Sequence, residues 1–299
     1  MITIENKSLR VEISPETGAS IISFAAKRGN EWLTITRPTP PEAIEQHNPS
    51  LMGSFTMAPW CNRLQDARFP FGGKMIELVA STPEGYATHG DVRKRPWTVV
   101  GQQSDSVMLR LTTRNFKDFN YPFPLVAKIR YSLVEDQFIT EFSLSNQGFD
   151  PTPAGFGFHP YFKRSLNGKL EDEASLRCQV SGLYPPMPSG ALLPIPADHD
   201  FSVLTPLGER VIDAVYSGWD GTATIRYPQS QLQLDYSCSE LLRHLCIFTP
   251  AGKSFFAVEP LSHGLNGFNL FAEGLPDTGV RVLQAGEGIE GTFAIKVTQ

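Results

Sequence analysis

The sequence predicts an all-β protein that folds as a single domain of 299 residues. Three observations predict this class. Short segments alternate apolar and polar side chains with a period of two, as half-buried strands do. Clusters of Gly, Pro, Asn and Asp separate these segments, and the chain contains 25 Gly and 24 Pro. No window keeps apolar residues at helical spacing over three turns, so long helices are not expected.

Several segments show the alternation clearly, and we expect each to form a strand with one buried face. They are, in chain order, Leu9–Ile13, Val107–Leu111, Ala127–Tyr131, Phe138–Leu144, Ala223–Tyr227 and Leu232–Tyr236. The signals recur as far as Gly288 without a polar linker between them, which favours one continuous domain over residues 1–299. The Pro-rich stretches Arg37–Pro41 and Tyr184–Pro188 are predicted to be surface loops, where β folds commonly bind ligands.

Charge and composition exclude several classes of protein. The formal net charge is −5, the sequence pI is near 5.7 and no basic run exceeds Arg93–Arg95, so nucleic acid is not an expected partner. The first residues carry no secretory signal and no apolar stretch approaches the roughly 20 residues that span a bilayer, so we expect a cytoplasmic protein without a membrane segment. The four cysteines, spaced neither for zinc nor for a disulfide framework, are predicted to be reduced thiols.

The segment Phe156–Phe162 places a single histidine, His159, among four aromatic side chains. Such surroundings partly desolvate an imidazole and fix its orientation. Because histidine titrates near neutral pH, His159 is a candidate general acid. The structural alternative is a core histidine whose hydrogen bonds are satisfied inside an aromatic cluster, and the local sequence leaves both interpretations open.

The apolar run Phe255–Leu261 contains one carboxylate, Glu259, directly before a proline. The run predicts a buried strand. A buried carboxylate needs a partner, a raised pKa or a functional reason, because its desolvation is costly. Glu259 is therefore a candidate functional residue, and the alternative is a glutamate that faces water where the strand stops.

The segment Ala58–Arg63 brings together a flat aromatic side chain, an amide and a guanidinium in Trp60, Asn62 and Arg63. Sugar sites use such groups, because an aromatic face covers C–H groups while forked donors and acceptors bind hydroxyls. His89 lies in a predicted loop and could also bind a hydroxyl. Read alone, each of these residues is as well explained by an ordinary turn.

Asp213 begins a turn-rich segment and could accept hydrogen bonds from two hydroxyls, although turn acids more often bond to their own backbone. His263, Asn266 and Asn269 follow Glu259 closely and could line the same site. No metal site is predicted, because the histidines lack the spacing of helical metal-binding pairs. Nucleotide and serine-hydrolase chemistries lack their usual sequence support, since the chain has neither the glycine loops of nucleotide sites nor the Gly-x-Ser-x-Gly elbow.

Five motifs, taken in order, resemble those of the aldose 1-epimerase (galactose mutarotase) family. They are Pro59–Arg63, His89–Gly90, His159–Phe162, Asp213 with Tyr216, and Val258–Pro260. The resemblance spans nearly the whole chain and implies a β-supersandwich that interconverts the α and β anomers of a free aldose without a cofactor. It also implies that His159 is the general acid and Glu259 the general base, and that Arg63, His89 and Asp213 hold sugar hydroxyls.

The chain departs from the best-known members of that family at two motifs. The segment after His89 is shortened to Gly90–Arg93, as in a divergent subgroup, and Glu259 is followed by Pro260–His263 rather than by the commoner Gln-His-Phe-Pro. The acid and the base are still matched. The departures leave the preferred sugar open.

Three alternatives remain open from the sequence. A glycosidase-like enzyme would need two carboxylates that flank the bond. A non-catalytic carbohydrate-binding protein would use the same binding groups without a matched acid and base. A hexose-6-phosphate mutarotase, a branch of the same family, would need a cationic pocket, for which Arg93, Lys94 and Arg95 are candidates. The sequence is compatible with a monomer and with a homodimer.

Overall fold

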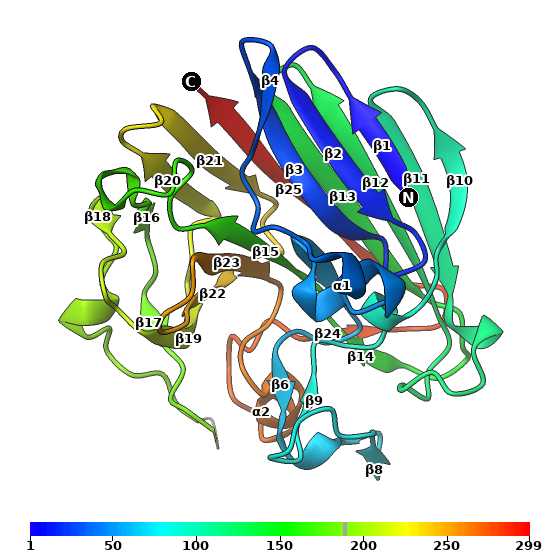
Figure 1. The fold of residues 1–299 in the computed structure, drawn as a ribbon. Coiled ribbons are helices and arrows are strands. Elements are labelled where there is room, and N and C mark those ends of the chain that lie inside the picture. The colour runs from blue at the N-terminus through cyan, green and yellow to red at the C-terminus, as the bar shows by residue number, and fades with distance from the viewer. Residues whose placement is uncertain (188–189) are drawn as a thin grey trace.

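The computed structural model describes residues 1–187 and 190–299, and most of its regular elements are strands (Figure 1). Within these residues, two large antiparallel sheets of ten and nine strands lie face to face, and three two-stranded ribbons lie beside them. The predicted all-β fold is confirmed. We call the ten-stranded sheet the first sheet and the nine-stranded sheet the second sheet.

The first sheet brings together strands from the beginning, middle and end of the chain. In spatial order it contains β1 (Ile2–Glu5), β2 (Leu9–Ser14), β3 (Ser20–Arg28), β5 (Ser54–Met57), β15 (Gly157–Lys163), β23 (Phe255–Leu261), β22 (His244–Thr249), β19 (Ile212–Ser217) and β17 (Gly182–Leu183), with β4 (Glu31–Thr34) paired to β3. Strands β15 and β23, distant in the sequence, are therefore neighbours near the middle of this sheet.

The second sheet covers one face of the first. In spatial order it contains β10 (Thr98–Gln102), β11 (Ser106–Thr112), β12 (Leu125–Val134), β13 (Gln137–Asn146), β25 (Gly288–Thr298), β21 (Leu232–Cys238), β20 (Thr222–Tyr227), β16 (Ser175–Cys178) and β18 (Thr205–Pro206). The segments that the sequence predicts as strands lie in β2, β11, β12, β13, β20, β21 and β23, so those predictions are confirmed.

Ribbons and short helices complete the described chain. The ribbons are β6 (Arg63–Leu64) with β9 (Ala87–Thr88), β7 (Arg68–Phe71) with β8 (Lys74–Glu77), and β14 (Thr152–Ala154) with β24 (Arg281–Leu283). The helices are α1 (Pro41–Glu45), α2 (Gly267–Ala272), η1 (Pro49–Leu51), η2 (Gln65–Ala67), η3 (Val92–Lys94), η4 (Thr113–Asn115), η5 (Leu170–Asp172) and η6 (Ala197–His199). Figure 1 shows β6, β9 and α2 gathered at one end of the first sheet.

The two Pro-rich stretches have different outcomes. Residues 37–40 lie outside regular helices and strands as predicted, and α1 begins at Pro41. Residues 184–187 also lie outside helices and strands, whereas Pro188 falls outside the described residues.

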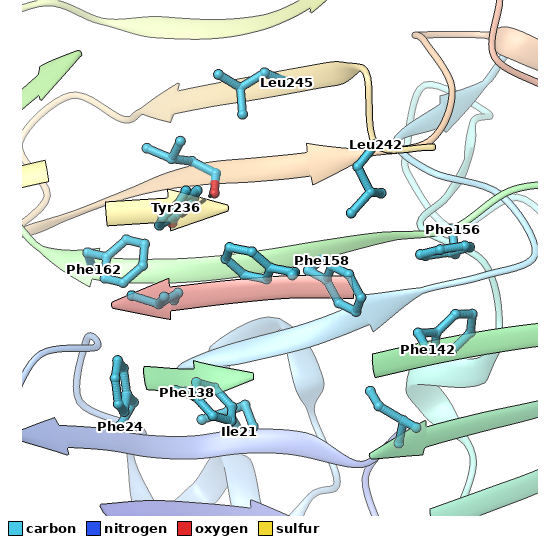
Figure 2. Packing of buried hydrophobic residues seen from close by; sticks show 14 of the residues in the cluster. Ile21, Phe24, Phe138, Phe142, Phe156, Phe158, Phe162, Tyr236, Leu242 and Leu245 are labelled. Atoms are coloured by element: carbon cyan, nitrogen blue, oxygen red, sulfur yellow. Dashed lines mark hydrogen bonds between the residues drawn. The ribbon is translucent and has the colours of Figure 1, made fainter. Parts of the chain in front are cut away.

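Aromatic side chains fill the space between the two sheets (Figure 2). The ring of Phe24 from β3 lies 5.1 Å from that of Phe138 in β13, and the ring of Phe158 from β15 lies 5.6 Å from that of Phe293 in β25. Large aromatic side chains dominate the burial of apolar surface in such a core. Because side chains alternate along a strand, this core determines which residues of β15 and β23 point the other way.

None of the helices in the described ranges is long and apolar enough to cross a bilayer. The four cysteines, Cys61, Cys178, Cys238 and Cys246, are free.

Candidate active site

His159 and Glu259 face each other on the side of the first sheet that is turned away from the core. Strands β15 and β23 pair in a register that places Tyr161 opposite Ala257, and His159 and Glu259 lie two positions along from this pair. The Nε2 atom of His159 is 3.2 Å from Oε1 of Glu259, and the two side chains are only 6% and 2% exposed. The structure thus joins the two candidate catalytic groups in one buried pair.

Three rings contact the imidazole of His159. The ring of Tyr161 is stacked on it with centroids 4.3 Å apart, and the ring of Phe55 from β5 lies 4.6 Å away. The hydroxyl of Tyr161 is 3.3 Å from Nε2. The sequence suggested that all the neighbouring rings of its own segment surround His159, but strand alternation directs Phe158 and Phe162 into the core. The third ring belongs to His89, at 5.3 Å.

The carboxyl group of Glu259 is surrounded by groups with opposing effects on its pKa. Burial raises the pKa of Glu259 well above its ordinary value, and the charge of Asp213 acts in the same direction. The thiol of Cys246 and the guanidinium of Arg63 lower the pKa. Burial outweighs the other effects, because transfer of a carboxylate out of water is costly.

The imidazole of His159 shows the complementary shift. Burial lowers the pKa of His159 well below its ordinary value, and the positive charges of Arg37 and Arg93 lower it further. Because His159 and Glu259 are in contact, they titrate as a pair rather than as separate groups. The two shifts stabilise the states in which the pair holds a single proton and carries no net charge.

Two polar atoms of this pair, and one beside it, have no hydrogen-bond partner among the described residues. They are Nδ1 of His159, Oε2 of Glu259 and Oδ1 of Asn62. Buried polar atoms are normally bonded, either within the protein or to a bound molecule. These atoms therefore mark positions where a polar ligand would complete the site.

The ribbon of β6 and β9 carries Asn62, Arg63 and His89 to the site. Arg63 pairs with Thr88 across the ribbon, and the amide of His89 donates to the carbonyl oxygen of Asn62 at 2.8 Å. Burial lowers the pKa of His89 well below its ordinary value, with His159 the next largest cause. A neutral imidazole can both donate and accept a hydrogen bond, which suits it to a hydroxyl group.

A close backbone approach fixes the position of His89. The next residue, Gly90, has φ of +64°, and a Cβ atom there would lie 1.9 Å from the carbonyl oxygen of Ala58. The amide of Asp91 donates to the same oxygen at 3.0 Å. Only glycine fits this position, which gives the predicted His89–Gly90 motif a physical reason.

Arg63 and Asp213 form an ion pair at the solvent side of the site. Asp213 lies in β19, and its Oδ2 atom is 2.6 Å from a terminal nitrogen of Arg63. The two side chains are 34% and 44% exposed, in contrast to the buried pair of His159 and Glu259. A molecule that enters from solvent would meet these two charged groups first.

Trp60 lies apart from these groups. Its side chain is 1% exposed, its indole N–H donates to the carbonyl oxygen of Ala87 at 3.2 Å, and its ring lies 6.0 Å from that of Tyr121. The ring belongs to the core and presents no face to a ligand. The sequence therefore located the correct segment, but the sugar-stacking role predicted for Trp60 has no support in its position.

His263 lies under the segment that carries Asn62. Its Nε2 atom accepts a hydrogen bond from the amide of Cys61 at 2.9 Å, and its Nδ1–H donates to the carbonyl oxygen of Gly264 at 2.9 Å. Burial lowers the pKa of His263 to about 4. Both ring nitrogens are used, so His263 supports the site from below.

Asn266 and Asn269 have a similar supporting role. The side-chain oxygen of Asn266 accepts from the amide of Gln65 at 3.0 Å, and the amide group of Asn269 donates to the same oxygen at 2.7 Å. These bonds hold the chain just after Arg63. The sequence suggested that the two residues line the site, whereas the structure places them beneath it.

No group of three or more His, Cys, Asp or Glu side chains within residues 1–187 and 190–299 is placed to hold a metal ion. Of the residues that the sequence offered as ligands, His263 uses both ring nitrogens within the chain.

In the basic run Arg93–Arg95 the two arginines are occupied by contacts within the chain, whereas Lys94 is exposed. Arg95 forms ion pairs with Asp91 at 2.6 Å and with Asp118 at 2.8 Å. Arg93 is buried and donates to the hydroxyl of Ser50 at 2.8 Å. These arginines do not form the open cationic pocket that the sequence allowed for a phosphate group.

Sequence reasoning missed several neighbours of the candidate catalytic pair. Cys246 lies opposite Glu259 in the register of β22 and β23, and its sulfur is 3.7 Å from the side-chain nitrogen of Asn62. Phe55 and Arg37 also lie close to the imidazole, as a ring neighbour and as a charge. Cross-strand register brings Cys246 to the site, and no local sequence signal reports register.

The model of the aldose 1-epimerase family matches residues 1–296 of the chain. The uncharacterized protein YphB of Escherichia coli (strain K12) is 26% identical over 273 residues, which cover 87% of each protein. A galactose mutarotase-like protein from Clostridium acetobutylicum superposes with a TM-score of 0.87 at 18% identity, covering 99% of this chain and 94% of that one. The GalM/aldose epimerase homologue from C. elegans superposes with a TM-score of 0.80 at 18% identity, covering 100% of this chain and 98% of that one. These likenesses confirm the predicted galactose mutarotase-like fold.

Proposed function

The chain belongs to the aldose 1-epimerase family, and we propose that it is a mutarotase that interconverts the α and β anomers of a free aldose. The observation that carries the proposal is the buried contact of 3.2 Å between Nε2 of His159 and Oε1 of Glu259. Opening a sugar ring requires one group that removes a proton and one that supplies a proton. A His–Glu pair in a site that is shielded from water offers both.

Ring opening begins at the anomeric hydroxyl. Glu259 takes the proton of this O1–H group, and the electrons of the O–H bond form the carbonyl of the aldehyde. The C1–O5 bond breaks, and His159 gives a proton to the ring oxygen O5. After rotation about the C1–C2 bond, the same two transfers run in reverse and close the ring on the other face. Positioned acid–base catalysis of this kind typically contributes about 10²–10⁴-fold.

The pair holds one proton throughout this cycle. The pKa shifts favour protonated Glu259 and neutral His159 in the free protein, and transfer of that one proton from Glu259 to His159 gives the reactive form with the closed sugar, a carboxylate beside an imidazolium. With the open-chain aldehyde, Glu259 is protonated again and His159 is neutral. The net charge of the buried pair therefore stays at zero. This matters because an unpaired charge in a buried site costs several kcal/mol, whereas internal proton transfer creates none.

Four further residues are proposed to bind the sugar hydroxyls. Arg63 and Asp213 have donors and acceptors that their mutual ion pair leaves free. Asn62 offers a buried side-chain oxygen that has no hydrogen-bond partner in the described part of the chain, and His89 offers a neutral imidazole. We leave Trp60 out of the proposed site because its ring is buried in the core.

The contacts of the basic run favour a sugar without a phosphate group. Arg95 is bound to two carboxylates, and Arg93 is buried beneath the site. A 6-phosphate would need cationic groups that are free to contact it. We therefore propose a neutral aldose as the substrate and include 6-phosphates in the test.

Polarimetry on freshly dissolved α anomers tests the proposal. The protein should accelerate the approach to the equilibrium rotation for at least one aldose in a broad panel that includes 6-phosphates. Unchanged rates across the whole panel would argue against catalysis. If sugars bound without any acceleration, a carbohydrate-binding protein would be the better description.

Near-isosteric variants test the assigned roles. Glu259→Gln and His159→Asn should each lower kcat by about 10²–10⁴-fold, because each removes one of the two proton-transfer groups. Glu141→Gln, on the second sheet, is the matched control and should keep the wild-type rate. Circular dichroism checks that each variant is folded. Near-normal turnover in either active-site variant would contradict the assignment.

A further inference from the structure

Two aromatic rings pack against the imidazole of His159. The ring of Tyr161 is stacked on it with centroids 4.3 Å apart, the ring of Phe55 is tilted against it at 4.6 Å, and the centroids of Tyr161 and Phe55 are 6.3 Å apart. The guanidinium of Arg37 lies over the ring of Tyr161, with Cζ 3.4 Å from its centroid. The guanidinium of Arg93 lies over the ring of Phe55 at 4.9 Å. A guanidinium group thus lies over each of the two rings that contact His159.

One short segment fixes both arginines. Arg37 donates from Nε to the carbonyl oxygen of Met52 at 2.9 Å and from a terminal nitrogen to the carbonyl oxygen of Ser50. Arg93 donates to the hydroxyl of the same Ser50 at 2.8 Å. The two guanidinium groups therefore have defined orientations, although they come from separate parts of the chain.

Neither guanidinium forms an ion pair with a carboxylate of the described chain. The residues are nonetheless nearly buried, with exposures of 7% for Arg37 and 6% for Arg93. Buried cations without a counter-charge are costly. Contact with an aromatic face recovers part of that cost. Two buried positive charges close to one imidazole indicate that these charges affect its protonation.

We propose that Arg37 and Arg93 are positioning residues that hold the imidazole of His159 through Tyr161 and Phe55 and make His159 a stronger proton donor to the sugar. The inference rests on the proposed role of His159 as general acid. It adds to that role a reason why the proton leaves His159 readily.

The charges around His159 support this direction. Glu259 faces it from β23, the hydroxyl of Tyr161 from β15, and the neutral ring of His89 from the loop after β9. Glu259, when ionised, favours the imidazolium. The two arginines and burial oppose it and lower the pKa of His159. Like charges near a titrating group commonly shift its pKa by about one unit or more.

The unfavourable effect of the two arginines on the imidazolium of His159 assists ring opening. The open-chain aldehyde is the less stable form of the sugar, and it is formed together with neutral His159 and protonated Glu259. By disfavouring the imidazolium, the arginines raise the free energy of the closed complex relative to the open one. The two complexes become closer in free energy, which lowers the barrier between them.

Side-chain NMR of the free protein tests the electrostatic step without a substrate. Arg37→Gln and Arg93→Gln each remove one charge, and Arg37→Lys and Arg93→Lys keep it. The ¹⁵N shifts of the His159 ring report its protonation at each pH, with His159→Asn used for assignment. We expect each Gln substitution to raise the pKa of His159 by about one unit and the Lys substitutions to restore most of the difference.

The matched control is Arg10→Gln. Arg10, in β2, also lies over an aromatic ring, with Cζ 4.4 Å from the ring of Trp32 in β4, but toward the end of the first sheet away from β15 and β23. Its substitution should leave the pKa of His159 unchanged. If Arg37→Gln fails to fold by circular dichroism, Arg93→Gln carries the test, because its charge acts on the same imidazole.

Kinetics distinguish this inference from the proposed function. The Gln variants should lower kcat by roughly threefold to tenfold and change KM little, because a weaker acid affects proton transfer rather than binding. If the protonation of His159 is the same in wild type and in both Gln variants, the inference is overturned. If the protonation shifts as expected but the wild type does not accelerate mutarotation, the proposed function fails and the electrostatic inference stands.

Discussion

Protonation of His263 should weaken the fold beneath the active site as the pH falls. The neutral ring accepts a hydrogen bond from the amide of Cys61 and donates one to the carbonyl oxygen of Gly264. A second proton on the ring would remove the acceptor and place a positive charge in a fully buried position. The folded state therefore resists protonation, which is why burial lowers the pKa of His263 to about 4.

The magnitude follows from the difference between the folded and unfolded pKa values. The ordinary value is 6.5 and the folded value is about 4, so the unfolded chain binds this proton first as the pH falls. The stability is complete above about pH 6.5 and declines progressively below it. At 1.36 kcal/mol per pH unit, the free energy of unfolding should lose about 3 kcal/mol by pH 4 through this residue alone.

Urea unfolding at pH 7 and at pH 4 measures this loss. His263→Gln keeps an acceptor for the Cys61 amide but has no titrating ring, so its free energy of unfolding should decline less than that of wild type, by about 3 kcal/mol. Ser262→Ala is the matched control, since it removes a buried acceptor of the Phe156 amide without a titrating group. Its cost should be equal at both pH values. Parallel losses in wild type and His263→Gln would refute the reasoning.

Three further predictions concern the site itself. The pH profile of kcat/KM should be bell-shaped, because the pair must hold one proton. Its plateau should lie between the lowered pKa of His159 and the raised pKa of Glu259. A decline of kcat/KM that sets in above about pH 6.5, as for an exposed histidine, would contradict the assigned coupling. Asp213→Asn should raise KM by about tenfold, the equivalent of one lost hydrogen bond to substrate. Its free energy of unfolding in urea should change by less than about 1 kcal/mol, because the ion pair with Arg63 is half-exposed. An unchanged KM would show that Asp213 does not bind the substrate. Cys246→Val should raise the pKa of Glu259 and move the alkaline limb of the pH profile to higher pH, since the thiol lowers that pKa. Cys246→Ser should return the alkaline limb to its wild-type position. Identical profiles for Cys246→Val and wild type would show that the thiol does not affect Glu259.

The fold follows from local sequence patterns to a large extent. Alternation of apolar and polar residues is visible in segments such as Ala127–Tyr131, because one face of each strand packs on the core and the other does not. The same rule places Glu259 on the face opposite Val258, away from the core. The sequence therefore predicts the strand, and it also indicates that the carboxylate within this strand is unusual.

Which strands pair, and in which register, does not follow from the same sequence patterns. His159 and Glu259 meet because β15 and β23 are neighbours, and their register depends on the packing of the whole sheet rather than on either segment. Resemblance to a family suggested the pair before the geometry was known. Cys246 and Phe55 reach the pair by the same cross-strand route and carry no local signal.

Two side chains show how local composition misleads. Trp60 occupies a turn that suits a sugar, yet the carbonyl of Ala87 and the ring of Tyr121 direct it into the core. Arg37 lies in a Pro-rich loop where an exposed cation is the ordinary expectation, yet the carbonyls of Ser50 and Met52 turn it inward. In both cases the deciding partner is remote in the sequence, so the orientation becomes known only from the fold.

The division of the site between two structural units has a consequence for how such proteins diversify. The proposed proton-transfer groups belong to adjacent central strands of a large sheet, whereas Arg63 belongs to a small ribbon, Asn62 and His89 lie directly beside its two strands, and Asp213 belongs to a strand farther out. Changes in the ribbon can alter which hydroxyl pattern is accepted while the reaction step stays intact. Under the proposed function, exchange of the ribbon between homologues is therefore a route to new sugar preferences on one unchanged sheet.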